Sequence, residues 1–352
     1  MARRRWLEER MRLEALRDFL AHKAVPIHRH SIWYYVGGIT LFLFGIQVFT
    51  GILLLLYYRP TPDAGFESIQ FIMTQVPFGW VIRSVHSWGA NLMVLAAFVH
   101  LFSVYFTRGY APPREVTWLS GMGLLALVLG FGFSGYLLPW NELAFFATKV
   151  GTDIVGVLPV IGKPILLFLR GGEEVTGATL TRFFGFHVAL LPMIATLVLI
   201  VHLALVQVHG MSEPLGKKRR EKFMPFYPHF MLREGIVWLA VLGVLLGLAT
   251  YLPWELGVKA DPFTPAPAGI RPEWYFTFLS QSLKYLPPHV LGFEGEQVGI
   301  IAFGLGGLLL VLVPFLDRRA GRGEHSALVT AFGIAVIAFM LVMITLAYVK
   351  PY

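Results

Sequence analysis

The chain contains no cysteine, and charged residues are scarce in it. The absence of cysteine excludes disulfides, iron–sulfur clusters, zinc–thiolate sites and thioether attachment of a cofactor within this chain. Only 14% of the 352 residues are charged, whereas 56% are hydrophobic. A composition this apolar indicates an integral membrane protein and excludes a soluble domain with a large core.

The net charge of +8 is the next constraint on the class of protein. A basic balance can indicate nucleic-acid binding, but in a membrane protein it more often reflects basic cytoplasmic loops, so we expect no nucleic-acid partner. Segment 1–31 opens with three arginines at 3–5 and two glutamates at 8–9, which predicts an amphipathic helix. It lacks a small-residue cleavage site ahead of a short apolar core, so we expect no signal peptide.

Seven apolar runs are long enough to cross a membrane as helices, and none contains Asp, Glu, Lys or Arg. They lie at 32–57, 85–107, 116–138, 183–208, 235–254, 297–316 and 326–349. We therefore expect an all-α integral membrane fold with seven transmembrane helices.

Loop charge predicts which way the chain crosses the membrane. The segments between the runs alternate between two faces, and the segments of the first face are 1–31, 108–115, 209–234 and 317–325. They hold 19 of the Lys and Arg residues, whereas the segments of the second face hold 10. The positive-inside rule makes the first face cytoplasmic, with the N-terminus inside and the C-terminus outside.

Two of the apolar runs contain two histidines each. His86 and His100 are fourteen residues apart, and His187 and His202 are fifteen apart. On a helix this is close to four turns, about 21 Å, which puts two imidazoles on roughly one face at two depths. Both runs cross from outside to inside, so His86 pairs with His187 at the outer level and His100 with His202 at the inner level. Haem iron fits two imidazoles approaching from opposite sides, so the pattern predicts two stacked b-type haems.

Two other interpretations of the histidines stay open. Each ring could be bonded separately to neighbouring carbonyls or hydroxyls, without binding a cofactor. The four could also form a proton relay in a histidine-gated transporter. Such a relay normally adds intramembrane carboxylates, and the seven runs contain none.

Four glycines share the spacing of the histidines. Gly37 and Gly51 in the first run are fourteen residues apart, and so are Gly121 and Gly135 in the third. A residue without a side chain lets a flat macrocycle lie against the backbone. The alternative is close helix packing, for which membrane helices commonly use glycine.

The outer loops 139–182 and 255–296 are long and rich in Pro, Gly and aromatic residues. The second contains Pro272-Glu273-Trp274-Tyr275, a carboxylate flanked by aromatic rings. This arrangement suits a flat substrate that loses protons, because burial would raise the pKa of the carboxyl toward neutrality. An interfacial aromatic belt is the alternative.

Six short motifs run through nearly the whole chain. They are Ile82-Arg83-Ser84-Val85-His86, Gly135-Tyr136-Leu137-Leu138-Pro139-Trp140, Pro159-Val160-Ile161-Gly162, Phe184-Gly185-Phe186-His187, Pro272-Glu273-Trp274-Tyr275 and Val313-Pro314-Phe315-Leu316. Together they resemble cytochrome b of the quinol:cytochrome c and plastoquinol:plastocyanin oxidoreductases. The fourteen- and fifteen-residue intervals resemble the chloroplast-type branch, which splits its core between a four-helix and a three-helix chain.

The resemblance implies a fused form, as found in some bacteria, with four parts. These are a cytoplasmic amphipathic segment (1–31), a four-helix di-haem domain (32–215), a basic cytoplasmic loop around Lys217–Arg220 (216–234) and a three-helix domain with the outer quinol-site loop (235–352).

The resemblance also implies roles for single residues. His86 and His187 would ligate a low-potential haem, His100 and His202 a high-potential haem, and Arg83 would pair with a haem propionate. Glu273, Tyr275 and Tyr136 would belong to the quinol-oxidation pocket. Arg233 and Glu234 match the pair lining an inner quinone pocket, although both could be ordinary residues at a helix start.

One departure from the chloroplast-type branch concerns its extra haem. That branch carries a thioether-forming cysteine where this chain has Tyr35, and an arginine where this chain has Gln207. We therefore expect no covalent third haem.

The activity implied is bifurcated quinol oxidation at the outer site and electron transfer through two haems to a quinone at the inner site, with proton translocation. The partners implied are a Rieske iron–sulfur protein and a c-type cytochrome or equivalent acceptor, around a homodimeric core in the lipid of a bacterial cytoplasmic membrane. A haem b anchor of another quinone-linked oxidoreductase is the alternative, although such anchors usually have fewer spans and lack Pro-Glu-Trp-Tyr.

Overall fold

The computed structural model describes residues 6, 8, 10, 14, 23–213, 215, 222–267 and 269–349. The basic run at 217–220, most of the amphipathic N-terminal segment and the tail at 350–352 lie outside these residues. Loop charge distinguishes the two ends of the helix bundle, which we call the inner end and the outer end.

Seven helical spans in the described part of the chain are long and apolar enough to cross a membrane, which confirms the expected fold class. Their helices are α3 (Tyr34–Leu55), α5 (Gly79–Thr107), α6 (Glu115–Tyr136), α10 (Leu191–His209), α11 (Met231–Tyr251), α13 (Gly295–Leu316) and α14 (Ala327–Val349). The fourth span begins earlier, with α9 (Gly177–Gly185) and a π-helical turn, η2 (Phe186–Leu190). These helices satisfy their own backbone hydrogen bonds, as the interior of a bilayer demands.

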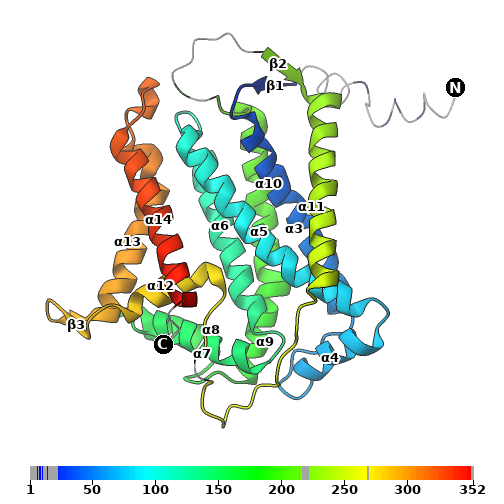
Figure 1. Cartoon of the computed structure of the whole chain (residues 1–352), viewed down its shortest axis with the longest axis vertical. Coiled ribbons are helices and arrows are strands. Elements are labelled where there is room, and N and C mark those ends of the chain that lie inside the picture. The colour runs from blue at the N-terminus through cyan, green and yellow to red at the C-terminus, as the bar shows by residue number, and fades with distance from the viewer. Residues whose placement is uncertain are drawn as a thin grey trace.

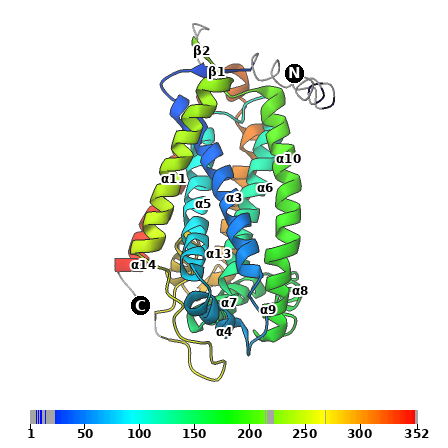
Figure 2. The same ribbon diagram turned by 90° about the vertical axis from the view of Figure 1, so that its right-hand side faces the viewer.

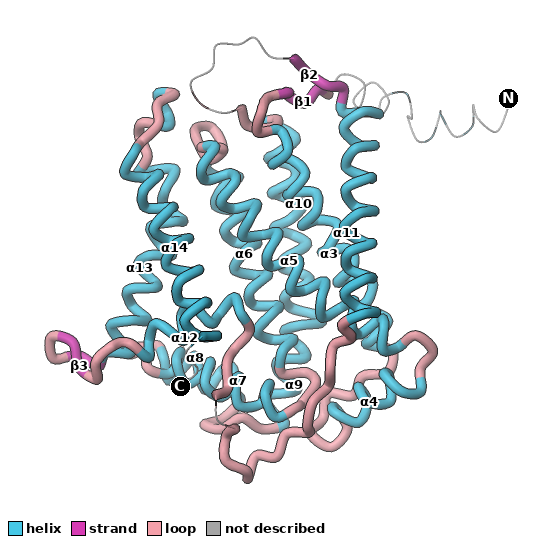
Figure 3. Tube along the Cα trace, viewed as in Figure 1, coloured by secondary structure: helices cyan, strands magenta, loops and turns pink. Residues whose placement is uncertain are grey.

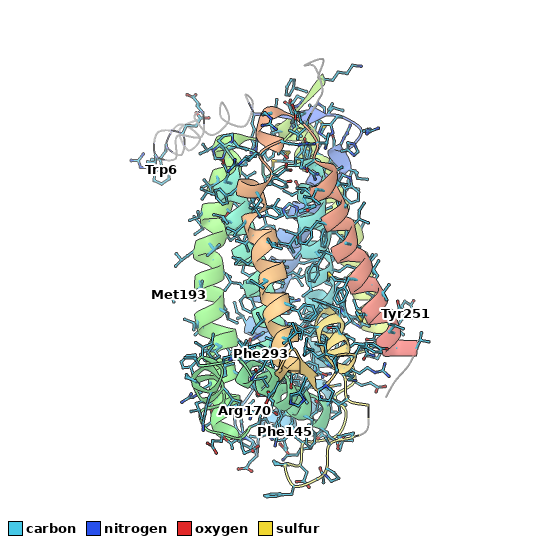
Figure 4. The ribbon with its side chains drawn as sticks, turned by 90° about the vertical axis from the view of Figure 1, so that its left-hand side faces the viewer. Trp6, Phe145, Arg170, Met193, Tyr251 and Phe293 are labelled. Carbon is cyan, nitrogen blue, oxygen red and sulfur yellow. The ribbon has the colours of Figure 1, made fainter. Side chains whose placement is uncertain are left out.

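The first four spans form the centre of the molecule. Helix α3 packs along α5, and α10 packs along α6. Helix α11 lies against α5 and α3 on one side of this group, and α13 and α14 lie on the other (Figure 1). Apolar side chains also cover the outside of the bundle, as Met193 on α10 does where it points away from the bundle (Figure 4). Such a surface suits contact with lipid.

Short elements cover the outer end (Figure 3). They are α4 (Gly65–Gln75), α7 (Glu142–Gly156), α8 (Gly162–Arg170), α9, α12 (Trp274–Lys284) and a hairpin of β3 (His289–Val290) and β4 (Phe293–Glu294). The side chain of Arg170 holds α7 and α8 together from a buried position. It donates to Thr152 Oγ1 at 2.7 Å and to Asp153 Oδ1 at 2.6 Å, and its backbone carbonyl accepts a bond from Thr179 of α9.

The inner end carries a small sheet that hydropathy did not predict. Strand β1 (Ala24–Ile27) lies beside β2 (Lys222–Pro225) at this end of the bundle (Figure 2). The two strands pair antiparallel, with Val25 opposite Met224. The sheet joins the segment before α3 to the segment before α11. Short helical turns flank it at η1 (Ser31–Trp33) and η3 (Phe226–Phe230), and another, η4 (Ala320–Arg322), follows α13.

Two helices begin earlier than the apolar runs and include charged residues. Helix α5 begins at Gly79, so Arg83 lies inside the helix, where it is buried with 4% of its surface exposed. Helix α11 begins at Met231, so Arg233 and Glu234 lie in its first turn. Hydropathy ends a run at the first charge, whereas a helix can continue through a charged residue, as α5 does at Arg83.

Candidate cofactor and substrate sites

The outer histidine pair is brought together from α5 and η2. The ring centroids of His86 and His187 lie 6.3 Å apart, with the ring planes at 72°. Two imidazoles bound to opposite sides of one metal ion, with bonds of about 2 Å and about 1 Å from nitrogen to centroid, have centroids about 6 Å apart. The spacing therefore fits a bis-histidine metal site.

The π-helical turn η2 explains the longer interval in the fourth span. Fifteen residues of regular α-helix would rotate His202 about 60° away from His187. A π-helical turn takes up about one extra residue. The interval thereby approaches the fourteen residues that separate His86 from His100 in α5, and both histidines of the span can face the same neighbours.

Hydroxyl groups on neighbouring helices contact Nδ1 of three of the four histidines. Thr50 Oγ1 lies 2.9 Å from Nδ1 of His86, Ser120 Oγ 2.9 Å from that of His202, and Ser134 Oγ 3.2 Å from that of His187. Each hydroxyl also lies within hydrogen-bond distance of a backbone carbonyl of its own helix, to which it can donate. A hydroxyl that donates to this carbonyl accepts from the ring, and this arrangement puts the ring proton on Nδ1 and leaves Nε2 available to bind a metal.

Each of the four glycines faces one of the four histidines. A Cβ added at Gly135 would meet Cε1 of His187 at 2.6 Å. The corresponding distances to Cε1 are 3.1 Å for Gly37 and His100, 3.2 Å for Gly121 and His202, and 3.4 Å for Gly51 and His86. The glycines thus leave room for the imidazoles themselves, which is more specific than general helix packing.

The inner histidine pair lines a cavity of about 400 Å³ that also contains Gly37 and Gly121. Three buried nitrogen atoms of its lining, Nδ1 of His100, Nε of Arg114 and Nδ1 of His209, have no hydrogen-bond partner among the described residues. A haem bound there would place its iron between the imidazoles, and the Arg114 guanidinium suits a propionate. The donor set fits the group. Sequence patterns counted Arg114 only as a loop charge, because one arginine carries no motif.

Within the described ranges, no group of three or more His, Asp or Glu side chains is placed to hold a bare metal ion. The histidines come in pairs, which suits a macrocycle that supplies the remaining ligands itself.

Three further residues predicted for the haem and inner quinone sites are charged, and they lie in different surroundings. Arg83 donates to the carbonyls of Trp254 and Glu255, the latter at 3.1 Å, and so ties α5 to the segment after α11. Glu234 lines the inner cavity, with its carboxyl against Gly38. Arg233 is exposed and does not line that cavity. The structure therefore separates two residues that the sequence pattern treated as a pair.

The outer carboxylate lies at the start of α12. Burial raises the pKa of Glu273 to about 7. The pKa of the neighbouring Tyr275 hydroxyl is raised by burial and by Glu273 and Tyr136, so the three predicted residues lie together. Trp274 donates from Nε1 to Asn91 Oδ1 of α5 at 2.9 Å, which fixes the start of α12 against the bundle.

A cavity of about 600 Å³ adjoins this group. It is lined by Pro272 and Thr277, and by Val150 and Ile154 of α7. Its volume lies within the usual range for small-molecule sites. The polar lining residues Ser280, Gln281 and Lys284 lie along α12. They were missed, because their spacing is that of any amphipathic surface helix.

Comparison with known proteins agrees with this geometry. Residues 21–210 match the family model described as cytochrome b/b6/petB, and residues 259–351 match that for cytochrome b(C-terminal)/b6/petD. A "Cytochrome bc complex cytochrome b subunit" of Chlorobaculum thiosulfatiphilum is 51% identical over 342 residues, covering 96% of this chain and 78% of that protein. A solved chain of a "Hyperthermophilic respiratory Complex III" has a TM-score of 0.81 at 29% identity, covering 98% of both chains. This chain therefore belongs to the cytochrome b/b6 family.

Proposed function

We propose that the chain is the di-haem cytochrome b subunit of a quinol-oxidising, proton-translocating complex. The observation that carries the proposal is the pairing of histidines from parallel spans at two levels, with Nδ1 in contact with a hydroxyl in three of them. His86 and His187 hold the outer haem, and His100 and His202 the inner haem. When bound, the two haems supply a one-electron path across the membrane.

The outer pocket is proposed to bind quinol between α7 and the start of α12. Glu273 accepts a proton there, because its pKa of about 7 lets the carboxylate and the acid interconvert near neutral pH. Tyr275 and Tyr136 flank the carboxyl and position the ring of the substrate. Because Glu273 lies at the outer end, the proton is then released on that side.

The inner cavity is proposed to bind quinone beyond the inner haem. Glu234 supplies a carboxyl to the cavity from the first turn of α11. Arg114 is proposed to hold a haem propionate, and the propionate role predicted for Arg83 stays a proposal for the outer haem. Proton uptake at this end and release at the other would build a proton gradient.

Partners complete the proposed reaction. One electron of each quinol goes to a high-potential acceptor on a Rieske iron–sulfur protein, and from there to a c-type cytochrome or equivalent carrier. The absence of cysteine means that no such cluster can reside on this chain. We propose a homodimeric core in a bacterial cytoplasmic membrane, with the N-terminus on the cytoplasmic side.

The test is a reduced-minus-oxidised absorption spectrum of the purified protein, combined with analysis of copurified subunits. We expect two b-type haems per chain and a copurified Rieske protein. A preparation without b-type haem would overturn the proposal. Two haems with a different iron–sulfur or molybdenum partner would instead indicate the anchor of another quinone-linked oxidoreductase.

A further inference from the structure

Each histidine of the two pairs faces a glycine. The residue before that glycine carries a hydroxyl group in three of the four cases. The four dipeptides are Thr50-Gly51, Ser120-Gly121, Ser134-Gly135 and Val36-Gly37. A hydroxyl residue precedes the glycine in the first three. In the fourth, which faces His100, the residue is valine.

The hydroxyls of the first three dipeptides make equivalent contacts. Thr50 lies against Nδ1 of His86, Ser134 against that of His187 and Ser120 against that of His202. The repeat of fourteen residues along α6 that relates Ser120 to Ser134 also relates Val36 to Thr50 along α3. Val36 therefore stands where the repeat would place a hydroxyl.

The exception leaves a buried donor without a partner. Nδ1 of His100 is buried, and no atom of the described residues accepts a hydrogen bond from it. An unpaired buried polar group costs free energy, so its presence at one of four equivalent positions calls for a reason. The other three positions show that the fold can supply an acceptor there.

We infer that Val36 sets the direction of electron flow by withholding a hydrogen bond from His100, so that the inner haem has the higher reduction potential. This rests on the proposed function. A ligand imidazole whose Nδ1–H donates to an acceptor is more basic and gives more electron density to iron. Greater electron density on iron favours the oxidised state and therefore lowers the reduction potential. Both ligands of the outer haem act in this way, whereas only one ligand of the inner haem does.

The test is a reciprocal pair of substitutions that move one hydroxyl between the two levels. Val36→Thr adds the missing acceptor at the inner level, and Thr50→Val removes the acceptor of His86 at the outer level. Threonine and valine have similar shapes, so each change tests the hydroxyl with little change in packing. Midpoint potentials of both haems are measured by spectroelectrochemical titration of the absorption bands.

We expect Val36→Thr to lower the inner potential without changing the outer one, and Thr50→Val to raise the outer potential without changing the inner one. A tenfold shift in a one-electron reduction equilibrium corresponds to about 59 mV, which such titrations resolve. Val48→Thr is the control, because this residue of α3 is 43% exposed and belongs to no dipeptide of the repeat. It should leave both potentials unchanged.

The outcomes separate this inference from the proposed function. Two b-type haems whose potentials do not respond to Val36→Thr and Thr50→Val would overturn the inference alone. A protein without b-type haem would overturn the proposed function. If Val36→Thr fails to bind the inner haem, Thr50→Val decides, and an unchanged outer potential then counts against the inference.

Discussion

Nε of Arg108 lies 3.2 Å from Oδ2 of Asp317, and both side chains are almost completely buried. Tyr110 donates its hydroxyl to the same carboxylate oxygen at 2.7 Å, and Arg108 also donates to Thr330 Oγ1 at 2.7 Å. Arg108 follows α5, Asp317 follows α13 and Thr330 belongs to α14. The ion pair therefore joins the four central spans to the last two at the inner end.

Replacing Asp317 by asparagine should destabilise the protein strongly. Removing one partner of a buried ion pair leaves the other charge uncompensated, which typically costs about 3–5 kcal/mol. Thermal unfolding in detergent, followed by circular dichroism, should show a midpoint lowered by several degrees. Glu324→Gln is the control, because the pair of Arg322 and Glu324 is exposed, with 3.8 Å between its charged atoms, and should contribute little. Equal midpoints for both variants would show that the buried pair does not join the spans.

Replacing Glu273 by glutamine should remove a pH dependence from quinol oxidation. Because burial raises the pKa of Glu273 to about 7, the carboxyl is protonated below that pH and cannot accept a proton. The rate for the unsubstituted protein should therefore rise as the pH increases through about 7. The variant should lose this rise and turn over roughly 10²-fold more slowly.

The measurement is steady-state quinol oxidation by the intact complex across this pH range. Glu67→Gln is a matched control at the same end of the molecule, because Glu67 is bonded to Lys259 on the surface, outside the pocket. It should keep both the rate and the pH profile. Full turnover and an unchanged profile in Glu273→Gln would exclude proton acceptance by this residue.

Replacing Gly135 by valine should cost the protein its outer haem. A Cβ at this position would lie 2.6 Å from Cε1 of His187, so the ring must move away from its position opposite His86. Pyridine haemochrome analysis and the reduced spectrum should show that one of the two haems is lost and the inner one retained. Gly45→Ala should bind both, because nothing lies within 4 Å of a Cβ there. Full haem content in Gly135→Val would mean that the glycine is not needed for ligation.

Replacing Glu234 by glutamine should slow reduction of quinone at the inner site. The carboxyl lines the inner cavity, and its loss should reduce the rate roughly tenfold if it assists proton delivery. The readout is reoxidation of the inner haem by added quinone after rapid reduction. Arg233→Gln is the control, since the adjacent Arg233 is exposed and outside the cavity. If Arg233→Gln slowed reoxidation of the inner haem and Glu234→Gln did not, Arg233 rather than Glu234 would be the functional residue.

Much of the fold could be predicted because lipid imposes a simple rule. A span must be apolar and helical, so each of the seven runs overlaps one helical span, and the two differ only at their ends. The largest differences are at Arg83, Glu234 and the start of α9. At Arg83 a charged side chain enters the helix because the carbonyls of Trp254 and Glu255, which hydropathy does not count, accept its hydrogen bonds.

The candidate sites were predictable to different extents. Helical geometry relates residues fourteen apart, so the level of each histidine and its matching glycine followed from spacing and loop charge. The strands β1 and β2, the lining of the outer cavity and the separation of Arg233 from Glu234 depend on segments far apart in the chain. The four-part division and the roles of the single residues stay predictions.

The sequence by itself determined that this is a seven-span membrane protein with histidines at two depths, because hydrophobicity and helical periodicity are local properties. Only the tertiary structure decided how the rings are oriented. A π-helical turn brings His187 into line, and hydroxyls from α3 and α6 reach Nδ1 of His86, His187 and His202 but not of His100. These contacts join different helices, and a pattern along one helix does not specify what its neighbour presents.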